Sequence, residues 1–121
     1  MKVLLSIKPI YANKILNGEK LFELRKLIPK KEFDTIVIYS SFPEKRIIWE
    51  FKVDKIICKN LDELWDITKE WSCVDKNFFD EYFKWKTKWY AIKVSNPVRY
   101  KESLPITEYT KTPPQGFMYI N

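Results

Sequence analysis

Apolar and polar residues alternate along the first third of the chain in short segments that predict strands separated by a helix. Residues 2–7 have the pattern of a strand, and Pro9 suits the first turn of a helix that ends before Gly18. Apolar and charged residues then alternate over residues 20–26, which predicts a second strand. Residues 35–39 are almost continuously apolar, as expected of a central strand.

The rest of the chain predicts one long strand, two capped helices and further short strands. Asn60 and Asp75 precede helical segments as N-caps, and the first of these helices ends near Glu70. Pro105, Pro113 and Pro114 keep the tail extended rather than helical, and Asn96-Pro97 predicts a turn between two strands. The predicted strands in this part of the chain are residues 46–57, 88–95, 98–101 and 117–120.

The order of these segments favours an α+β fold. Several strands follow one another without an intervening helix, which disfavours a purely parallel doubly wound sheet. A mixed or antiparallel sheet fits better if it curls into a small, partly open β-barrel with helices at its rim. The 121 residues fit one domain, which we expect to span residues 1–121.

Composition narrows the classes of function. No apolar run is long enough to cross a membrane, and the first residues lack a cleavable leader pattern, so we expect a cytoplasmic protein. The chain has no histidine, which excludes Ser-His-Asp catalysis and His-ligated metals. Cys58 and Cys73 cannot form a zinc site alone, so we expect two reduced thiols, no metal and no cofactor.

The positive charge is concentrated in the first quarter of the chain. Residues 1–31 hold eight basic and two acidic side chains, and the difference, +6, equals the net charge of the whole chain. Such an excess attracts polyanions, although lysines also serve simply to solvate a surface. Both interpretations stay open at this level.

The strand after Gly18 carries the residues best suited to chemistry. Lys20, Glu23, Arg25 and Lys26 lie within seven residues, and such charges are either solvated or paired around a cleft. In a cleft, Glu23 would accept a hydrogen bond from the amine of a base, and Arg25 would hold a phosphate or stack on a base. Lys20 would contact a phosphate or, with its pKa lowered by burial, act as a general base.

The pattern Gly-x-Lys-x-x-Glu-x-Arg, which spans Gly18 to Arg25, resembles the signature of ASCH domains. The tail 113–117 resembles the Pro-Pro-Gln-x-Phe ending of a prokaryotic branch labelled as predicted transcriptional regulators, and residues 78–83 and 89–93 resemble that branch too. The resemblance implies a PUA-like fold that binds RNA or modified bases beside the barrel. The resemblance extends to two enzymatic branches of the ASCH family. One removes acyl groups from N4 of cytidine nucleosides, and the other cuts RNA. Glu23 stands where the amide-hydrolysing branch has a Thr nucleophile.

These observations define the predicted site and three candidate functions. The first candidate is a module that binds RNA, a nucleotide or a modified nucleoside. The second is a nucleoside- or RNA-directed hydrolase that uses Lys20 and Glu23. The third is a protein-interaction domain. We expect a monomeric protein that does not bind a membrane. The predicted ligand-binding residues are Lys8, Lys20, Glu23, Arg25, Lys26, Tyr39, Ser40, Gln115 and Phe117.

Some of these residues have a second interpretation. Tyr39 and Ser40 either line the cleft or simply end a central strand. Gln115 and Phe117 either fold across the cleft or only close the barrel. Trp85, flanked by lysines, suits a nucleic-acid contact, but a partly packed Trp is the favoured interpretation.

Overall fold

The computed structural model, which describes residues 1–120, has its strands and helices in almost the order that the sequence predicts. The strands are β1 (Lys2–Ile7), β2 (Phe22–Arg25), β3 (Thr35–Ser40), β4 (Arg46–Cys58), β5 (Tyr90–Leu104) and β6 (Phe117–Ile120). The helices are α1 (Pro9–Leu16), α2 (Leu61–Thr68) and α3 (Lys76–Phe83), with a 3-10 turn, η1 (Ile106–Glu108), in the tail.

The six strands form one mixed sheet in the order β2-β5-β4-β3-β1-β6. Strands β1 and β3 are parallel, and every other neighbouring pair is antiparallel. The sheet curls into a partly open barrel with β2 at one edge and β6 at the other, which confirms the predicted α+β class.

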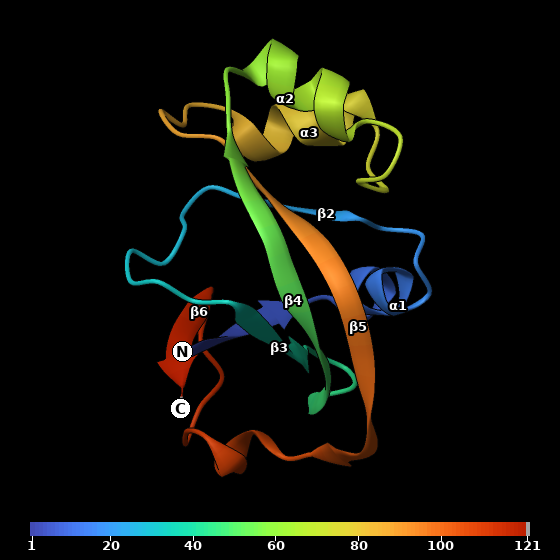
Figure 1. Cartoon of the computed structure of the whole chain (residues 1–121), viewed down its shortest axis with the longest axis vertical. Helices are drawn as coiled ribbons and strands as arrows, with labels where there is room; N and C mark the ends of the chain where they lie inside the picture. Colours follow the sequence, from blue (N-terminus) through green and yellow to red (C-terminus); the bar gives the residue numbers. More distant parts are fainter. Residues whose placement is uncertain (121) are drawn as a thin grey trace.

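The long strands β4 and β5 run through the whole molecule (Figure 1). Helices α2 and α3 lie over one end of this pair, and η1 lies at the other end. Helix α1 packs against β3 and β5, and one apolar cluster, with the fully buried Trp49, fills the space beneath it. A second cluster, which contains Phe79 and Phe83, joins α2 and α3 to β2 and β5.

Both predicted helix caps form. The Asn60 side chain accepts a hydrogen bond from Glu63 N at 2.9 Å, and the Asp75 side chain accepts one from Phe78 N at 2.8 Å. Gly18 follows α1 with a φ of +82°, a left-handed conformation that glycine adopts without steric cost. These local signals are reliable because each is satisfied within a few residues of the chain.

Three predictions in the second half of the chain are wrong. Asn96-Pro97 is not a turn, because β5 continues through it. Asn96 has a φ of +46°, and the register between β4 and β5 shifts near this point, so the irregularity is absorbed as a bulge within one long strand. The strand begins at Tyr90 rather than Lys88, and the tail holds η1 where an extended chain is predicted. Pro105 precedes η1, and Pro113 and Pro114 follow it, so the prolines of the tail do not interrupt this turn.

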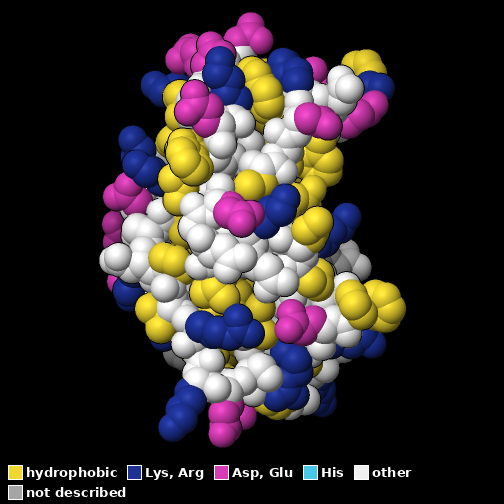
Figure 2. All heavy atoms as spheres, turned by 90° about the vertical axis from the view of Figure 1, so that its right-hand side faces the viewer, with side chains coloured by type: hydrophobic (Ala, Val, Ile, Leu, Met, Phe, Trp, Pro, Cys, Tyr) yellow, Lys and Arg dark blue, Asp and Glu magenta, His cyan; other side chains and the backbone are white. Residues whose placement is uncertain are grey.

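The surface mixes charged and apolar side chains. Figure 2 shows basic and acidic groups interspersed over the face on the right of Figure 1. Trp85 is 90% exposed at a turn position with a φ of +64°, so its predicted partial packing is wrong. It lies beyond the end of α3, where the chain leaves the helical layer. None of the helices within residues 1–120 is long and apolar enough to cross a membrane.

Candidate functional site

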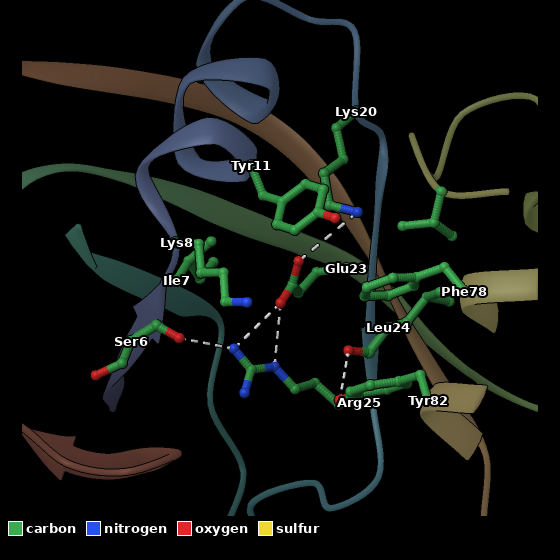
Figure 3. Close-up of a pocket in the computed structure, with 11 residues that line it drawn as sticks. Ser6, Ile7, Lys8, Tyr11, Lys20, Glu23, Leu24, Arg25, Phe78 and Tyr82 are labelled. Carbon is green, nitrogen blue, oxygen red and sulfur yellow. Dashed lines mark hydrogen bonds and ion pairs between the residues drawn. The ribbon is translucent and has the colours of Figure 1, made fainter. Parts of the chain in front are cut away.

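A cavity of about 230 Å³ lies between β2, the junction of β1 and α1, and α3 (Figure 3). We call it the β2 cavity. Its polar and charged lining residues are Ser6, Lys8, Lys20, Glu23 and Arg25. Its apolar and aromatic lining residues are Ile7, Tyr11, Leu24, Val74, Phe78 and Tyr82. Four predicted site residues, Lys8, Lys20, Glu23 and Arg25, are thus brought together.

The Glu23 carboxylate lies between two cations in this cavity (Figure 3). Glu23 Oε2 accepts a hydrogen bond from Arg25 Nε at 3.1 Å and lies 3.1 Å from Arg25 Nη2. Glu23 Oε1 lies 3.9 Å from Lys20 Nζ, at the outer limit of an ion pair. The side chains of Lys20, Glu23 and Arg25, which we call the charged triad, are only 3%, 10% and 17% exposed. A triad with these exposures is paired around a cleft and is not solvated.

Lys20 is the most deeply buried member of the triad. Its ammonium group donates a hydrogen bond to the Ser72 carbonyl oxygen and lies 5.2 Å from the centre of the Tyr11 ring. Burial lowers the pKa of Lys20, because desolvation disfavours the charged form, and the neighbouring Glu23 carboxylate opposes this effect in part. At a given pH, a larger fraction of Lys20 is therefore in the neutral form that can accept a proton than for a lysine in water.

Local structure explains why a lysine is buried here. The chain turns at Gly18, and the backbone N–H groups of Glu19 and Lys20 both donate to the Lys14 carbonyl oxygen at the end of α1. The segment between α2 and α3 then crosses the start of β2, where Trp71 O accepts from the N–H groups of Leu21 and Phe22. This crossing brings Ser72 O over Lys20.

Arg25 links the charged triad to the tail of the chain. Its Nη2 donates to the Ser6 carbonyl oxygen at 2.9 Å. Ser6 in turn donates from its backbone N to Gly116 O at 3.2 Å, and from its hydroxyl to Pro114 O at 2.7 Å. The rim of the cavity is therefore fixed to residues 114–116 through one serine.

Aromatic rings form the wall that faces the triad (Figure 3). Phe78 and Tyr82 project from α3 with nearly parallel rings, 9° apart in plane and 6.1 Å between centroids. Tyr11 of α1 lies 6.2 Å from Phe78. Tyr82 donates its hydroxyl to Leu24 O at 3.1 Å, and burial raises the pKa of this hydroxyl.

Sequence reasoning did not assign these aromatic residues to the site. The signal that points to them is a helix with aromatic side chains on two faces: Phe79 and Phe83 fill the core, whereas Phe78 is 42% exposed. A second aromatic face is more than the core of this helix uses. The sequence shows that face, but it does not show that α3 lies opposite β2.

Three further predicted residues lie beside the cavity rather than in it. Lys26 places its ammonium group 4.4 Å from the centre of the Tyr82 ring. Together with Gln115 and Phe117, Lys26 lines an adjoining groove that also includes Arg25 and Tyr82. Gln115 and Phe117 thus lie next to the cavity rim and do not fold across its mouth.

Tyr39 and Ser40 do not line the cavity, so the expectation that they face it is wrong. Tyr39 is 4% exposed and packs in an apolar cluster with Leu4 and Ile120, and Ser40 is fully buried. Strand β3 continues to Ser40, which pairs with Ile7 of β1. Both residues therefore belong to the sheet and not to a loop after it.

Two polar atoms of the charged triad keep unused hydrogen-bonding capacity. Glu23 Oε1 retains room for a donor, because its ion-pair partner is 3.9 Å away. Within residues 1–120, Arg25 Nη1 has no protein partner among the hydrogen bonds of that side chain. No group of three or more Cys, Asp or Glu side chains in this range is arranged to hold a metal ion. The cavity thus offers one anionic acceptor, cationic donors and aromatic faces.

Comparisons with known proteins agree on the family and the fold. The family model described as ASCH domain matches residues 5–98. The ASCH protein of Zymomonas mobilis superposes with a TM-score of 0.86 at 21% identity, covering 99% of this chain and 87% of that chain. A single-residue variant of the same protein gives a TM-score of 0.89 at 21% identity, covering 99% and 88%.

Two curated relatives match the chain over a segment of their own length. Large ribosomal subunit protein uL22 of Ureaplasma parvum is 23% identical over 98% of this chain, which spans 39% of that protein. ATP synthase subunit alpha of the same organism is 21% identical over 98% of this chain, which spans 15% of that protein. The chain therefore spans less than half the length of the curated relatives it matches.

Proposed function

The chain belongs to the ASCH domain family and has its PUA-like α+β fold, and from that premise we propose that the β2 cavity binds an unpaired base of an RNA. One observation carries the proposal: a buried carboxylate, held on one oxygen by Arg25 and open on the other, lies opposite an aromatic wall. The RNA part of the proposal rests on the family resemblance and on the basic first quarter of the chain.

The size of the cavity suits one planar ring system. Its volume of about 230 Å³ is below the roughly 300–1,000 Å³ of pockets for drug-sized ligands. Stacking on aromatic side chains is the usual way in which proteins hold unpaired bases, at about 1–3 kcal/mol per base. Phe78, which is 42% exposed on the wall of the cavity, offers such a face.

The charged triad favours a base with an exocyclic amine, cytosine above all. Glutamate accepts a hydrogen bond from the cytosine N4 amine, whereas uracil presents an acceptor at the same position. Arg25 holds Glu23 Oε2, so Oε1 is the acceptor that remains for the amine. A uracil oxygen placed there would face the carboxylate oxygen, and neither atom carries a proton with which to form a hydrogen bond.

Binding measurements on the intact chain test the proposal. We expect cytidine to bind more tightly than uridine by about fivefold or more, because each mismatched hydrogen-bonding edge costs about 1–3 kcal/mol. Phe78→Ala removes a stacking face without opening the core, and we expect cytidine affinity to fall by about fivefold or more. Phe42→Ala is the matched control, because Phe42 is 76% exposed in the β3–β4 turn and lies outside the cavity.

The Glu23→Gln variant tests the preference for cytosine. Its amide can also donate to uracil, so we expect the ratio of cytidine to uridine affinity to fall towards one. Equal affinity of the unmodified chain for cytidine and uridine would contradict the role of Glu23. Unchanged cytidine affinity in Phe78→Ala would contradict the site itself.

A second candidate function is hydrolysis of an acylated nucleoside or RNA, with Lys20 and Glu23 as the acid–base pair. The observation in its favour is the burial of Lys20 beside the Glu23 carboxylate, because burial lowers the pKa of Lys20 and so favours the neutral form that a general base needs. Turnover of N4-acetylcytidine that disappears in Lys20→Met would support it. Binding of this nucleoside without turnover would leave the cavity as a binding site only.

A further inference from the structure

A groove of about 490 Å³ adjoins the β2 cavity on the side of the tail. Residues 25–27, Tyr82 and residues 115–117 line this groove, which we call the tail groove. Arg25 and Tyr82 line both the tail groove and the β2 cavity. The cavity and the groove therefore meet at these two side chains.

We propose that the tail groove is a second nucleotide subsite, so that the ligand is a single-stranded oligonucleotide of at least two nucleotides. This inference rests on the proposed function, because the first base occupies the β2 cavity. The neighbouring nucleotide along the strand lies in the tail groove, and the phosphodiester between them lies at Arg25.

The tail groove has the chemistry that a second base needs. Leu27, 74% exposed, and the half-buried Phe117 supply apolar surface, and the exposed Gln115 supplies an amide that can both donate and accept hydrogen bonds. Base stacking on such surfaces tolerates any sequence. The groove is therefore expected to select weakly among bases, in contrast to the cavity with its single carboxylate.

Arg25 stands where the bridging phosphate would pass. Its Nε and Nη2 atoms are engaged by Glu23 and the Ser6 carbonyl, and these bonds fix the guanidinium plane. In Figure 3 its remaining nitrogen points away from both partners. Lys26 adds a second cation on the Tyr82 ring, 4.4 Å from its centre. A fixed guanidinium with one nitrogen free is suited to a phosphate oxygen.

Hydrogen bonds within the chain preform the tail groove. Ser6 holds Pro114 O and Gly116 O at 2.7 and 3.2 Å, and the same residue accepts from Arg25. The tail is thereby fixed against the rim of the cavity before any ligand arrives. A preformed second subsite adds affinity, because little ordering of the protein remains to oppose binding.

Affinity for a dinucleotide compared with a nucleoside tests the inference. We expect cytidylyl-cytidine to bind the intact chain more tightly than cytidine by about fivefold or more, which is the effect of one additional stacked base. A methylphosphonate version has no charge on its linkage, and we expect it to lose part of this gain. Equal affinity for cytidine and cytidylyl-cytidine would overturn the second subsite and leave the proposed base site intact.

A charge placed in the groove gives an independent test. Leu27→Glu sets a carboxylate beside the path of the phosphate, so the advantage of the dinucleotide should fall by at least severalfold while cytidine affinity stays as it was. Ile67→Glu, on α2 and 43% exposed, is the matched control and should keep the full advantage. An undiminished dinucleotide advantage in Leu27→Glu would overturn this path. Absence of cytidine binding altogether would overturn both proposals.

Discussion

At the scale of single residues, the charged triad places one carboxylate between two cations, with little exposure of any of the three side chains. Alternation along residues 20–26 places Glu23 and Arg25 on one face of a strand, and they do form an ion pair in the structure. The sequence left open whether these charges are solvated or paired. The answer depends on Ser72, which lies 52 positions from Lys20. No pattern near Lys20 reveals that contact.

The buried ammonium group of Lys20 makes stability depend on pH. Its pKa in the folded chain is lowered from 10.5, mainly by burial. Between the lowered value and 10.5, the unfolded chain binds more protons than the folded chain, so this group makes stability rise with pH. We expect the free energy of unfolding, measured with denaturant, to rise relative to Lys20→Met through this window, with a slope of at most about 1.4 kcal/mol per pH unit.

The Lys20→Met variant is its own control for the other titrating groups, because it retains all of them. Parallel stability profiles of the two proteins up to pH 10.5 would contradict the lowered pKa. A difference that favours the variant increasingly as pH rises would contradict its sign.

At the scale of elements, local sequence signals predict the positions of helices and strands along the chain better than they predict which elements contact one another. Both caps and the left-handed Gly18 were predicted, because they depend on a few neighbouring residues. The Asn96-Pro97 dipeptide is compatible with a turn and with a bulge. Only the pairing of β5 with β4 determines that it forms a bulge. The cavity wall on α3 was missed because helix placement over β2 is a tertiary property.

The two capped helices offer a matched pair of variants. Asp75→Ala and Asn60→Ala each remove a side-chain acceptor at a helix N-terminus, so each should lower the free energy of unfolding by about 0.5–2 kcal/mol. Only α3 carries Phe78 and Tyr82. We therefore expect Asp75→Ala alone to weaken cytidine binding, measured by calorimetry under conditions where both variants are folded. Equal weakening in both variants would mean that binding follows global stability and not the position of α3.

At the scale of the whole molecule, the proposed binding of a polyanion rests on the open sheet and the uneven charge. Strand β2 lies at an edge of the sheet, and the cavity beside it is lined by the end of β1, α1, α3 and the segment before α3. Of the basic residues in 1–31, Lys8, Lys20 and Arg25 line the cavity and Lys26 lies beside it, whereas Lys2 pairs with Glu50 and Lys31 lies over Tyr119 of β6. At the opposite edge, β6 pairs with β1, and residues 114–116 before it lie at the rim of the β2 cavity.

Salt dependence measures the contribution of this charge. Each phosphate neutralised on a single strand contributes about −0.7 to the slope of log affinity against log salt. We expect a slope near zero for cytidine, about −0.7 for cytidylyl-cytidine and a steeper slope for a longer single-stranded RNA. Fluorescence anisotropy over a range of potassium chloride concentrations gives the last of these. An RNA affinity that is insensitive to salt would contradict a role for the basic first quarter.

The most direct test of the central claim is an amide NMR titration of the isotopically labelled chain with cytidine and, separately, uridine. The claim predicts that cytidine shifts the amides of residues 6–8, 18–25 and 74–82, which surround the β2 cavity, while β3 and the β3–β4 turn stay unchanged. Uridine should cause smaller shifts at the same positions and saturate at higher concentration. Shifts confined to other surfaces, or none with either nucleoside, would contradict the claim that this cavity binds a base.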